Sequence, residues 1–158
     1  MNIEDDKATK SFFPNLNIIF IALLSGQTIY FVLGLYLILS GDMRGMSELN
    51  TIFIFITPVV VLSSITASKF IYSKQVSEFD KTLPLENKLI SYRTNNIIKL
   101  ALLEGANIFN ISVMIITANY LFAALFIIIV VLFLLNRPTK EKFIMDYEIS
   151  AEDVIKIL

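Results

Sequence analysis

Glu104 is the residue whose type and position most directly suggest chemistry in this chain. It lies inside a long apolar run, in the stretch of residues 99–107. An ionised carboxylate in the middle of a membrane helix costs about 2.5–3.5 kcal/mol on insertion scales, so it turns inward, finds partners or takes up a proton. The other predicted membrane spans contain no acidic residue. Hypotheses about function therefore start at Glu104.

Polar side chains near Glu104 define a candidate intramembrane site. Asn107 is three residues further along and hence on the same helix face. Asn110 follows one turn later, and the first apolar segment supplies Ser25 and Thr28. Three roles are open for the carboxyl. It can hold the helices of the protein together, bind a proton or cation, or contact a partner protein or lipid headgroup.

The composition argues against most enzyme classes. The chain has no Cys and no His, so it lacks thiolate metal ligands, the commonest general base and the commonest transition-metal ligand. No metal cluster or nucleophile elbow accompanies the Ser and Asp residues of the loops. We therefore predict no catalytic, cofactor-binding or metal-binding residues. The formal net charge of −1 gives no basic footprint for nucleic acid.

Hydropathy places the chain in a membrane. The apolar fraction is 56%, above the roughly 45–50% of soluble domains, and mean hydropathy is +0.72. A helix needs roughly 20 apolar residues to cross a bilayer, and four segments qualify. We predict spans at about 16–39, 51–72, 97–117 and 119–135, with a kink at Pro58 in the second. The whole chain, 1–158, is expected to form a single four-helix transmembrane domain.

The positions of Lys and Arg predict the orientation. Eleven of the 13 basic residues lie before the first span, at the end of the second or between it and the third, or after the fourth. Arg44 is the basic residue of the opposite side, and Lys99 lies at a boundary. Cytoplasmic flanks are enriched in Lys and Arg, so we expect a multi-pass protein of the cytoplasmic (inner) membrane with both termini in the cytoplasm.

The predicted cytoplasmic segments are a connection at 73–96 and a tail at 136–158. Pro84 suits the first turn of a helix, and helical spacing then continues into the third span. We therefore predict one helix from about Pro84 to Thr117, with its first turns in the cytoplasm. The tail contains two short helical segments, the second opening on a capping box at 150–153. Its apolar residues suit either the cytoplasmic helices of the protein itself or a membrane surface or partner helix.

The chain contains an internal repeat. When residues 17–30 are aligned with 96–109, eight of the fourteen positions are identical. Both copies keep a small-xxx-small pair, Ala22 with Gly26 and Ala101 with Gly105, a spacing that lets helices approach closely in lipid. The fold predicted is thus an all-α membrane protein of two parallel-repeat hairpins. The small pairs indicate helix packing, either within the bundle or in a homo-oligomer.

Three short stretches carry a family resemblance: residues 101–105, the turn at 117–119 and the segment 137–142. On these, the chain resembles a group of uncharacterised small bacterial four-span membrane proteins. The resemblance implies the topology and no known activity. We expect a non-enzymatic structural or accessory component of the membrane, with the lipid bilayer and a membrane protein or second copy as partners. The alternative is a small proton- or ion-coupled transport element that uses Glu104.

Overall fold

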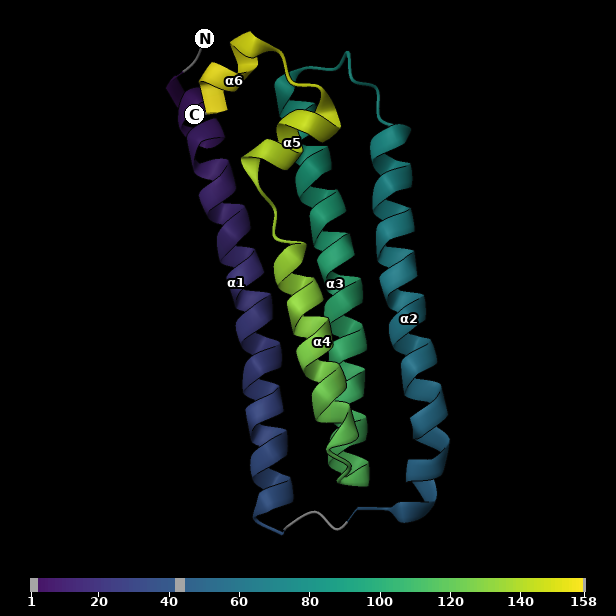
Figure 1. Cartoon of the computed structure of the whole chain (residues 1–158). Coiled ribbons are helices and arrows are strands. Elements are labelled where there is room, and N and C mark those ends of the chain that lie inside the picture. Colours follow the sequence, from purple (N-terminus) through teal and green to yellow (C-terminus); the bar gives the residue numbers. More distant parts are fainter. Residues whose placement is uncertain (1–2, 42–44, 158) are drawn as a thin grey trace.

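The computed structural model describes residues 3–41 and 45–157 and contains helices without strands in those ranges. Four long helices are followed by two short ones (Figure 1). Their bounds are α1 Ile3–Leu39, α2 Ser47–Ser77, α3 Leu85–Thr117, α4 Leu121–Leu135, α5 Lys140–Tyr147 and α6 Ala151–Ile157. The predicted all-α class is confirmed.

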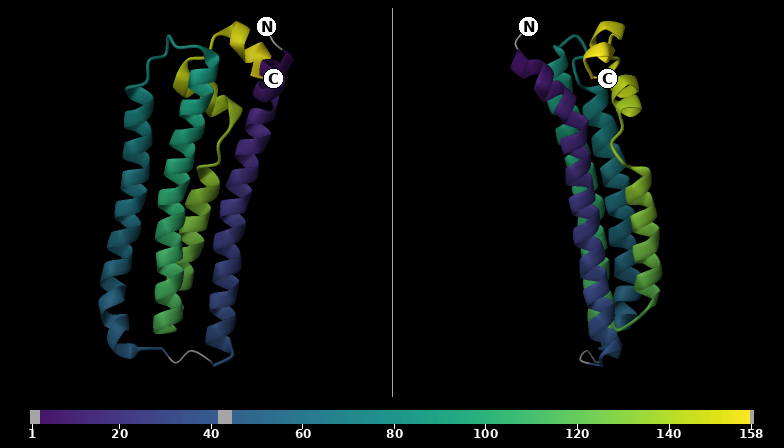
Figure 2. Two further views of the ribbon diagram at one scale, coloured as in Figure 1. Left: turned by 180° about the vertical axis from the view of Figure 1, so that it is seen from behind. Right: turned by 90° about the vertical axis from the view of Figure 1, so that its left-hand side faces the viewer.

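The four long helices form a bundle of two antiparallel hairpins. Helices α1 and α3 run in one direction, and α2 and α4 return in the other (Figures 1 and 2). The start of α1, the α2–α3 connection and helices α5 and α6 all gather at one end of the bundle. The segments predicted to share one side of the membrane therefore share one end of the molecule. The repeat relation between the hairpins stays a prediction.

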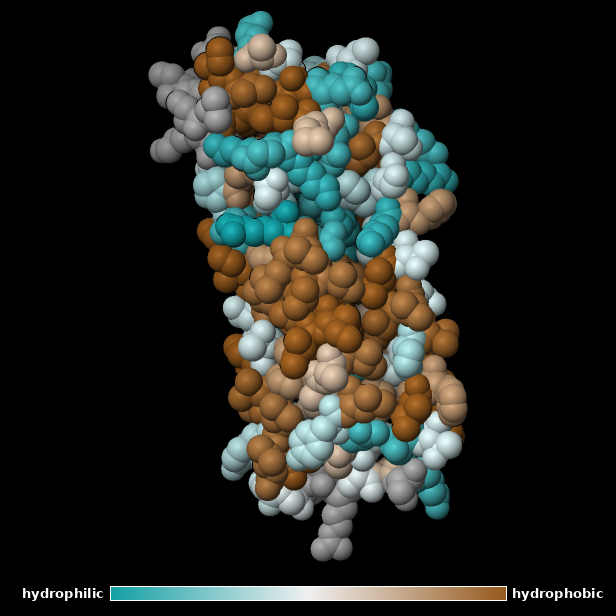
Figure 3. All heavy atoms as spheres, in the orientation of Figure 1, coloured by the Kyte–Doolittle hydropathy of each residue, from teal (hydrophilic) through white to brown (hydrophobic). Residues whose placement is uncertain are grey.

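Within the described ranges, three helices are long and apolar enough to cross a membrane: residues 11–39, 48–77 and 85–117. A fourth span is counted if α4 and α5 are taken together, across a bend of 67°. Helix α4 alone has 15 residues, about 22 Å against a hydrocarbon core of about 30 Å. Figure 3 shows a hydrophobic belt around the middle of one face, with hydrophilic residues towards both ends.

Helix α3 occupies the centre of the bundle and packs against α1, α2 and α4. In its most apolar stretch 56% of the residues are buried, against 17% in α1 and in α2. The remaining faces of α1 and α2 carry exposed Ile, Val, Leu and Phe side chains, which suits contact with lipid tails. The least apolar of the long helices is thus the one shielded by the others.

Helices α1, α2 and α3 extend beyond their predicted spans, chiefly at the end of the bundle that carries α5 and α6. Helix α3 runs without interruption from Leu85, as the prediction of one helix from about Pro84 to Thr117 requires. Helix α1 begins at Ile3 and α2 continues to Ser77, so the non-helical part of the predicted 73–96 connection is 78–84. Helix α2 continues through Pro58 as a single helix.

The C-terminal tail packs on the protein's own helices. Phe143, Tyr147, Ile149 and Ile157 are buried together with side chains of α1 and α3, chiefly Leu16, Leu89 and Tyr92. Ser150 Oγ accepts a hydrogen bond from the backbone N–H of Asp153 at 3.2 Å, which is half of the predicted capping box. Of the two placements expected for the tail, the structure shows the one on the protein's own helices.

Candidate functional site

Glu104 lies on α3 at the edge of the α1–α3 contact. Its side chain is half-buried, and a Cβ added at Gly26 of α1 would lie 4.0 Å from its Oε1. Within the described ranges, no residue gives it a hydrogen bond or an ion pair. The carboxyl is therefore partly exposed next to Gly26.

Asn107 forms a hydrogen bond with a residue of α1 and none with Glu104. Its Nδ2 donates to Oε1 of Gln27 at 2.5 Å, and both side chains are fully buried. A hydrogen bond between two amides of different helices satisfies polar groups that cannot bind water in a lipid environment. This bond is a fully buried polar link between α1 and α3.

Asn110 makes the corresponding link between α3 and α4. Its Nδ2 donates to the backbone carbonyl of Phe122 at 2.8 Å, and the side chain is fully buried. Further along α3, Tyr30 of α1 and Ser112 of α3 share a hydrogen bond of 3.0 Å. Asn107 and Asn110 thus join the central helix to its neighbours on two sides.

Some polar atoms of the bundle interior have no hydrogen-bond partner among the described residues. They are Gln27 Nε2, Thr57 Oγ1, Asn107 Oδ1 and Asn110 Oδ1. Each unpaired buried amide or hydroxyl costs free energy. After the links between the helices have formed, these four atoms are still available for a further hydrogen bond.

The remaining predicted site residues lie outside the bundle interior. Ser25 and Thr28 are exposed, and the Thr28 hydroxyl donates back to the carbonyl of Leu24 at 2.7 Å. The structure brings Asn107 and Asn110 into the interior and leaves Ser25, Thr28 and Glu104 on its outer side. Gln27, which was not assigned to the predicted site, is the α1 residue that enters it.

The small residues of the two predicted pairs lie on the surface of the bundle, whereas Gly34 lies in its interior. Ala22, Gly26, Ala101 and Gly105 are all exposed on α1 and α3, and a Cβ added at Gly105 would meet nothing within 4 Å. Gly34 is buried instead, and a Cβ there would lie 2.9 Å from Cγ1 of Ile115. The closest approach of α1 to α3 at a glycine is therefore at Gly34, one helix turn and more beyond the repeat.

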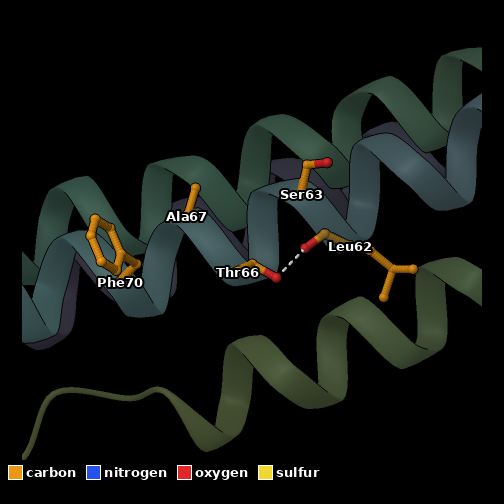
Figure 4. A pocket seen from close by; sticks show the side chains of 5 residues that line it. All are labelled: Leu62, Ser63, Thr66, Ala67 and Phe70. Carbon is orange, nitrogen blue, oxygen red and sulfur yellow. Dashed lines mark hydrogen bonds between the residues drawn. The ribbon is translucent and has the colours of Figure 1, made fainter.

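A shallow groove lies on the outer face of α2. It is lined by Leu62, Ser63, Thr66, Ala67 and Phe70 (Figure 4). All five come from one helix face, and the Thr66 hydroxyl already donates to the carbonyl of Leu62 at 2.8 Å. Such back-bonding satisfies a hydroxyl in an apolar helix, so the groove offers little to a polar ligand.

Charged groups gather at the end of the bundle that carries α5 and α6. Lys81, in the α2–α3 connection, donates to Glu148 at the end of α5, and this bond lowers the pKa of the Glu148 carboxyl. Hydrogen bonds from Thr82 likewise lower the pKa of Asp80. In the part of the chain that the structure describes, no three His, Cys, Asp or Glu side chains gather as metal ligands would.

Comparison with protein-family models, with curated proteins and with solved structures finds no match to this chain.

Proposed function

We propose that this protein is a non-enzymatic structural or accessory component of a membrane, acting through contact with other membrane-spanning helices. The observation that carries the proposal is the use of the polar side chains. Gln27, Asn107 and Asn110 link the helices of the bundle to one another, whereas Glu104 stands beside exposed small residues and has no hydrogen-bond or ion-pair partner among the described residues. A carboxyl in that position suits a polar or basic side chain of a second helix.

The proposal includes the location and the family. Both ends of the chain meet at one end of the bundle, and the excess of Lys and Arg in the segments of that end supports a cytoplasmic position for it. We place the protein in the cytoplasmic (inner) membrane on the same ground. Membership of the uncharacterised four-span bacterial group rests on its resemblance in short sequence stretches.

Crosslinking in native membranes tests the accessory role. Because the chain has no Cys, single Ala22→Cys or Ala101→Cys variants place one thiol on the surface beside Glu104. We expect these variants to crosslink to a membrane protein, either another chain or a second copy, and Glu104→Gln in the same background to weaken the product. Phe55→Cys, on the exposed face of α2, is the matched control. Equal crosslinking from all three positions, or from none, contradicts the proposal.

Proton- or ion-coupled transport through Glu104 is the second candidate. The unpaired oxygens of Asn107, Asn110 and Thr57 inside the bundle favour it, because oxygen atoms are the ligands of a transported hard cation. In vesicles with the purified protein, this candidate predicts flux that Glu104→Gln abolishes without loss of folding. If the wild-type protein shows no flux, transport is excluded and the accessory role is unaffected.

A further inference from the structure

Two lysines from different helices meet over one aromatic ring where α4 gives way to α5. Nζ of Lys99 lies 4.6 Å from the ring centroid of Tyr72, and Nζ of Lys142 lies 4.9 Å from the same centroid. Lys99 belongs to α3, Tyr72 to α2 and Lys142 to α5. Three helices thus converge on this cluster, which we call the lysine cluster.

The lysine cluster is unusually buried for its charge. Lys99 is 3% exposed and Tyr72 is 8% exposed, whereas Lys142 is half-buried. Lysine is almost never fully buried unless it is paired with an opposite charge. Within the described ranges, no carboxylate forms an ion pair with Lys99 or Lys142.

The charges around Lys99 do not balance. Lys142 and Lys69 are the like charges that act on it, and Asp146 is the opposite one. The Asp146 carboxylate is engaged by the Tyr72 hydroxyl, which donates to its Oδ2 at 2.5 Å. Two like charges and one opposite charge therefore act on Lys99, and the Tyr72 ring holds Lys99 and Lys142 close together. An arrangement of this kind is stabilised by an added anion.

The position of the lysine cluster suggests where that anion comes from. Lys99 precedes Leu100, which packs with Phe133 in the last turns of α4, and Lys142 lies in the helix that follows the 67° bend. Figure 3 shows hydrophilic residues bordering the hydrophobic belt on the side of α5. This is the depth at which phospholipid headgroups lie, and basic sites between helices at that depth bind anionic headgroups.

We propose that Lys99 and Lys142, with Lys69 at the rim, bind the phosphate group of a phosphodiester or of inorganic phosphate. Each ammonium supplies up to three donors and a full charge, and a phosphate group offers several acceptor oxygens at once. The Tyr72 ring supports both ammoniums from α2 through cation–π contacts. Asp146 accepts the hydrogen bond of the Tyr72 hydroxyl and, within the described ranges, forms no ion pair with Lys99 or Lys142.

Lipid and phosphate titrations of the full-length protein test the site. In native mass spectrometry from detergent, we expect the wild type to retain phosphatidylglycerol and to retain little diacylglycerol, which has no phosphate. The Lys99→Met/Lys142→Met variant keeps the apolar stems and removes both charges. Its affinity for phosphatidylglycerol is expected to fall about tenfold or more, since a charged hydrogen bond contributes at least that factor.

The matched control is Lys74→Met, which removes an exposed ammonium of α2 whose ion-pair partner is Glu78. It is expected to leave lipid retention unchanged. Thermal unfolding with inorganic phosphate, against chloride at equal ionic strength, separates the two sources. Stabilisation by phosphate together with weak lipid retention assigns the site to the free anion. The opposite pattern assigns it to a headgroup.

Two results would overturn the proposal. One is a wild type that does not prefer phosphatidylglycerol over diacylglycerol and does not respond to phosphate, a result that needs no variant. The other is equal binding by the wild type and Lys99→Met/Lys142→Met. If the double variant does not fold, Lys99→Arg takes its place. It preserves the charge, so the proposal requires that it keep phosphate-dependent stabilisation.

Discussion

At the residue scale, the amide pair of Gln27 and Asn107 is the most consequential polar contact of the bundle interior. Removing one partner leaves the other buried and unpaired, which costs more than the bond itself contributes. We predict that Asn107→Leu and Gln27→Leu each destabilise the folded protein, and that the double variant loses less than the sum. The expected coupling is about 1 kcal/mol.

Thermal or denaturant unfolding of the four proteins in detergent measures this coupling. Thr28→Ala serves as the control, because Thr28 is exposed and bonded only to its own helix; its effect is expected within about 0.5 kcal/mol. Strictly additive losses from Gln27→Leu and Asn107→Leu would show that the two amides do not interact.

Gly34 provides a second prediction at this scale. A side chain there would collide with Ile115 and Met114 of α3, whereas one at Gly105 would enter open space. We expect Gly34→Val to lower stability by about 1–3 kcal/mol through overpacking. Gly105→Val changes helix propensity in the same way, so the difference between the two melting temperatures reports the packing at Gly34. Equal melting temperatures would contradict the close α1–α3 approach.

At the scale of elements, the bend between α4 and α5 is held by one side chain of α3. The Tyr92 hydroxyl donates to the carbonyl of Thr139 at 2.9 Å and accepts from the Thr139 N–H at 3.1 Å. Tyr92 is fully buried beside Phe143 and Tyr147. The backbone N–H and carbonyl of Thr139, the residue that caps α5, thus both form hydrogen bonds with the hydroxyl of Tyr92.

Tyr92→Phe therefore tests the attachment of the tail. It keeps the ring packing and leaves the two Thr139 groups unpaired, so we predict a loss of about 1–2 kcal/mol concentrated in α5. Hydrogen exchange should accelerate in 137–147 and remain unchanged in α2. Tyr36→Phe, an exposed tyrosine of α1, is the control. Uniform acceleration across all helices would indicate a global effect in place of a local one.

The elements themselves could be predicted well from the sequence. Apolar runs, Pro84 and the capping box at 150–153 mark the helices α3 and α6 locally, because helix formation depends on nearby residues and on caps. The start of α1 at Ile3 was not predicted, since its first turns are polar and gain their helical state from continuity with an apolar helix and from the tail packed against it.

The identity of the interior residues was harder to predict for a physical reason. In lipid, the outward and inward faces of a helix are both apolar, so periodicity does not distinguish them. Only the neighbouring helices decide that Gln27 points inward while Ser25 and Thr28 point outward. The same holds for Gly34, whose role comes from Ile115 of another helix. The polar residues of α3 were the feature of the sequence that indicated the bundle interior, and α3 is the central helix.

At the scale of the whole molecule, acidity should loosen one end of the bundle before the other. The pKa of Glu148 is lowered by Lys81 and that of Asp80 by Thr82. A carboxyl with a lowered folded-state pKa contributes stability that is present above the unfolded value, about 4.3 for Glu, and is lost as pH falls through the folded value.

We therefore predict that acidification from pH 6 to pH 3 lowers the hydrogen-exchange protection factors, which are measured relative to the intrinsic exchange rate at each pH, first in 78–84 and 140–148. Glu148→Gln removes the ion pair with Lys81 and should reproduce part of that loss of protection at pH 6, leaving a smaller response to acid. An acid response that begins in the turn at 117–120, at the opposite end, would contradict the assignment.

From the overall arrangement we predict that the two ends of the bundle face opposite sides of a membrane. Met46, beside the start of α2, is 58% exposed, and Met145, in α5, is 77% exposed. Since the natural chain has no Cys, Met46→Cys and Met145→Cys each create a single thiol. In intact cells a membrane-impermeant reagent should label Met46→Cys and spare Met145→Cys, and both should react after permeabilisation. Labelling of both thiols in intact cells would mean that the two ends of the bundle do not lie on opposite sides of the bilayer. Labelling of Met145→Cys alone would mean that the orientation is opposite to the one that Lys and Arg predict.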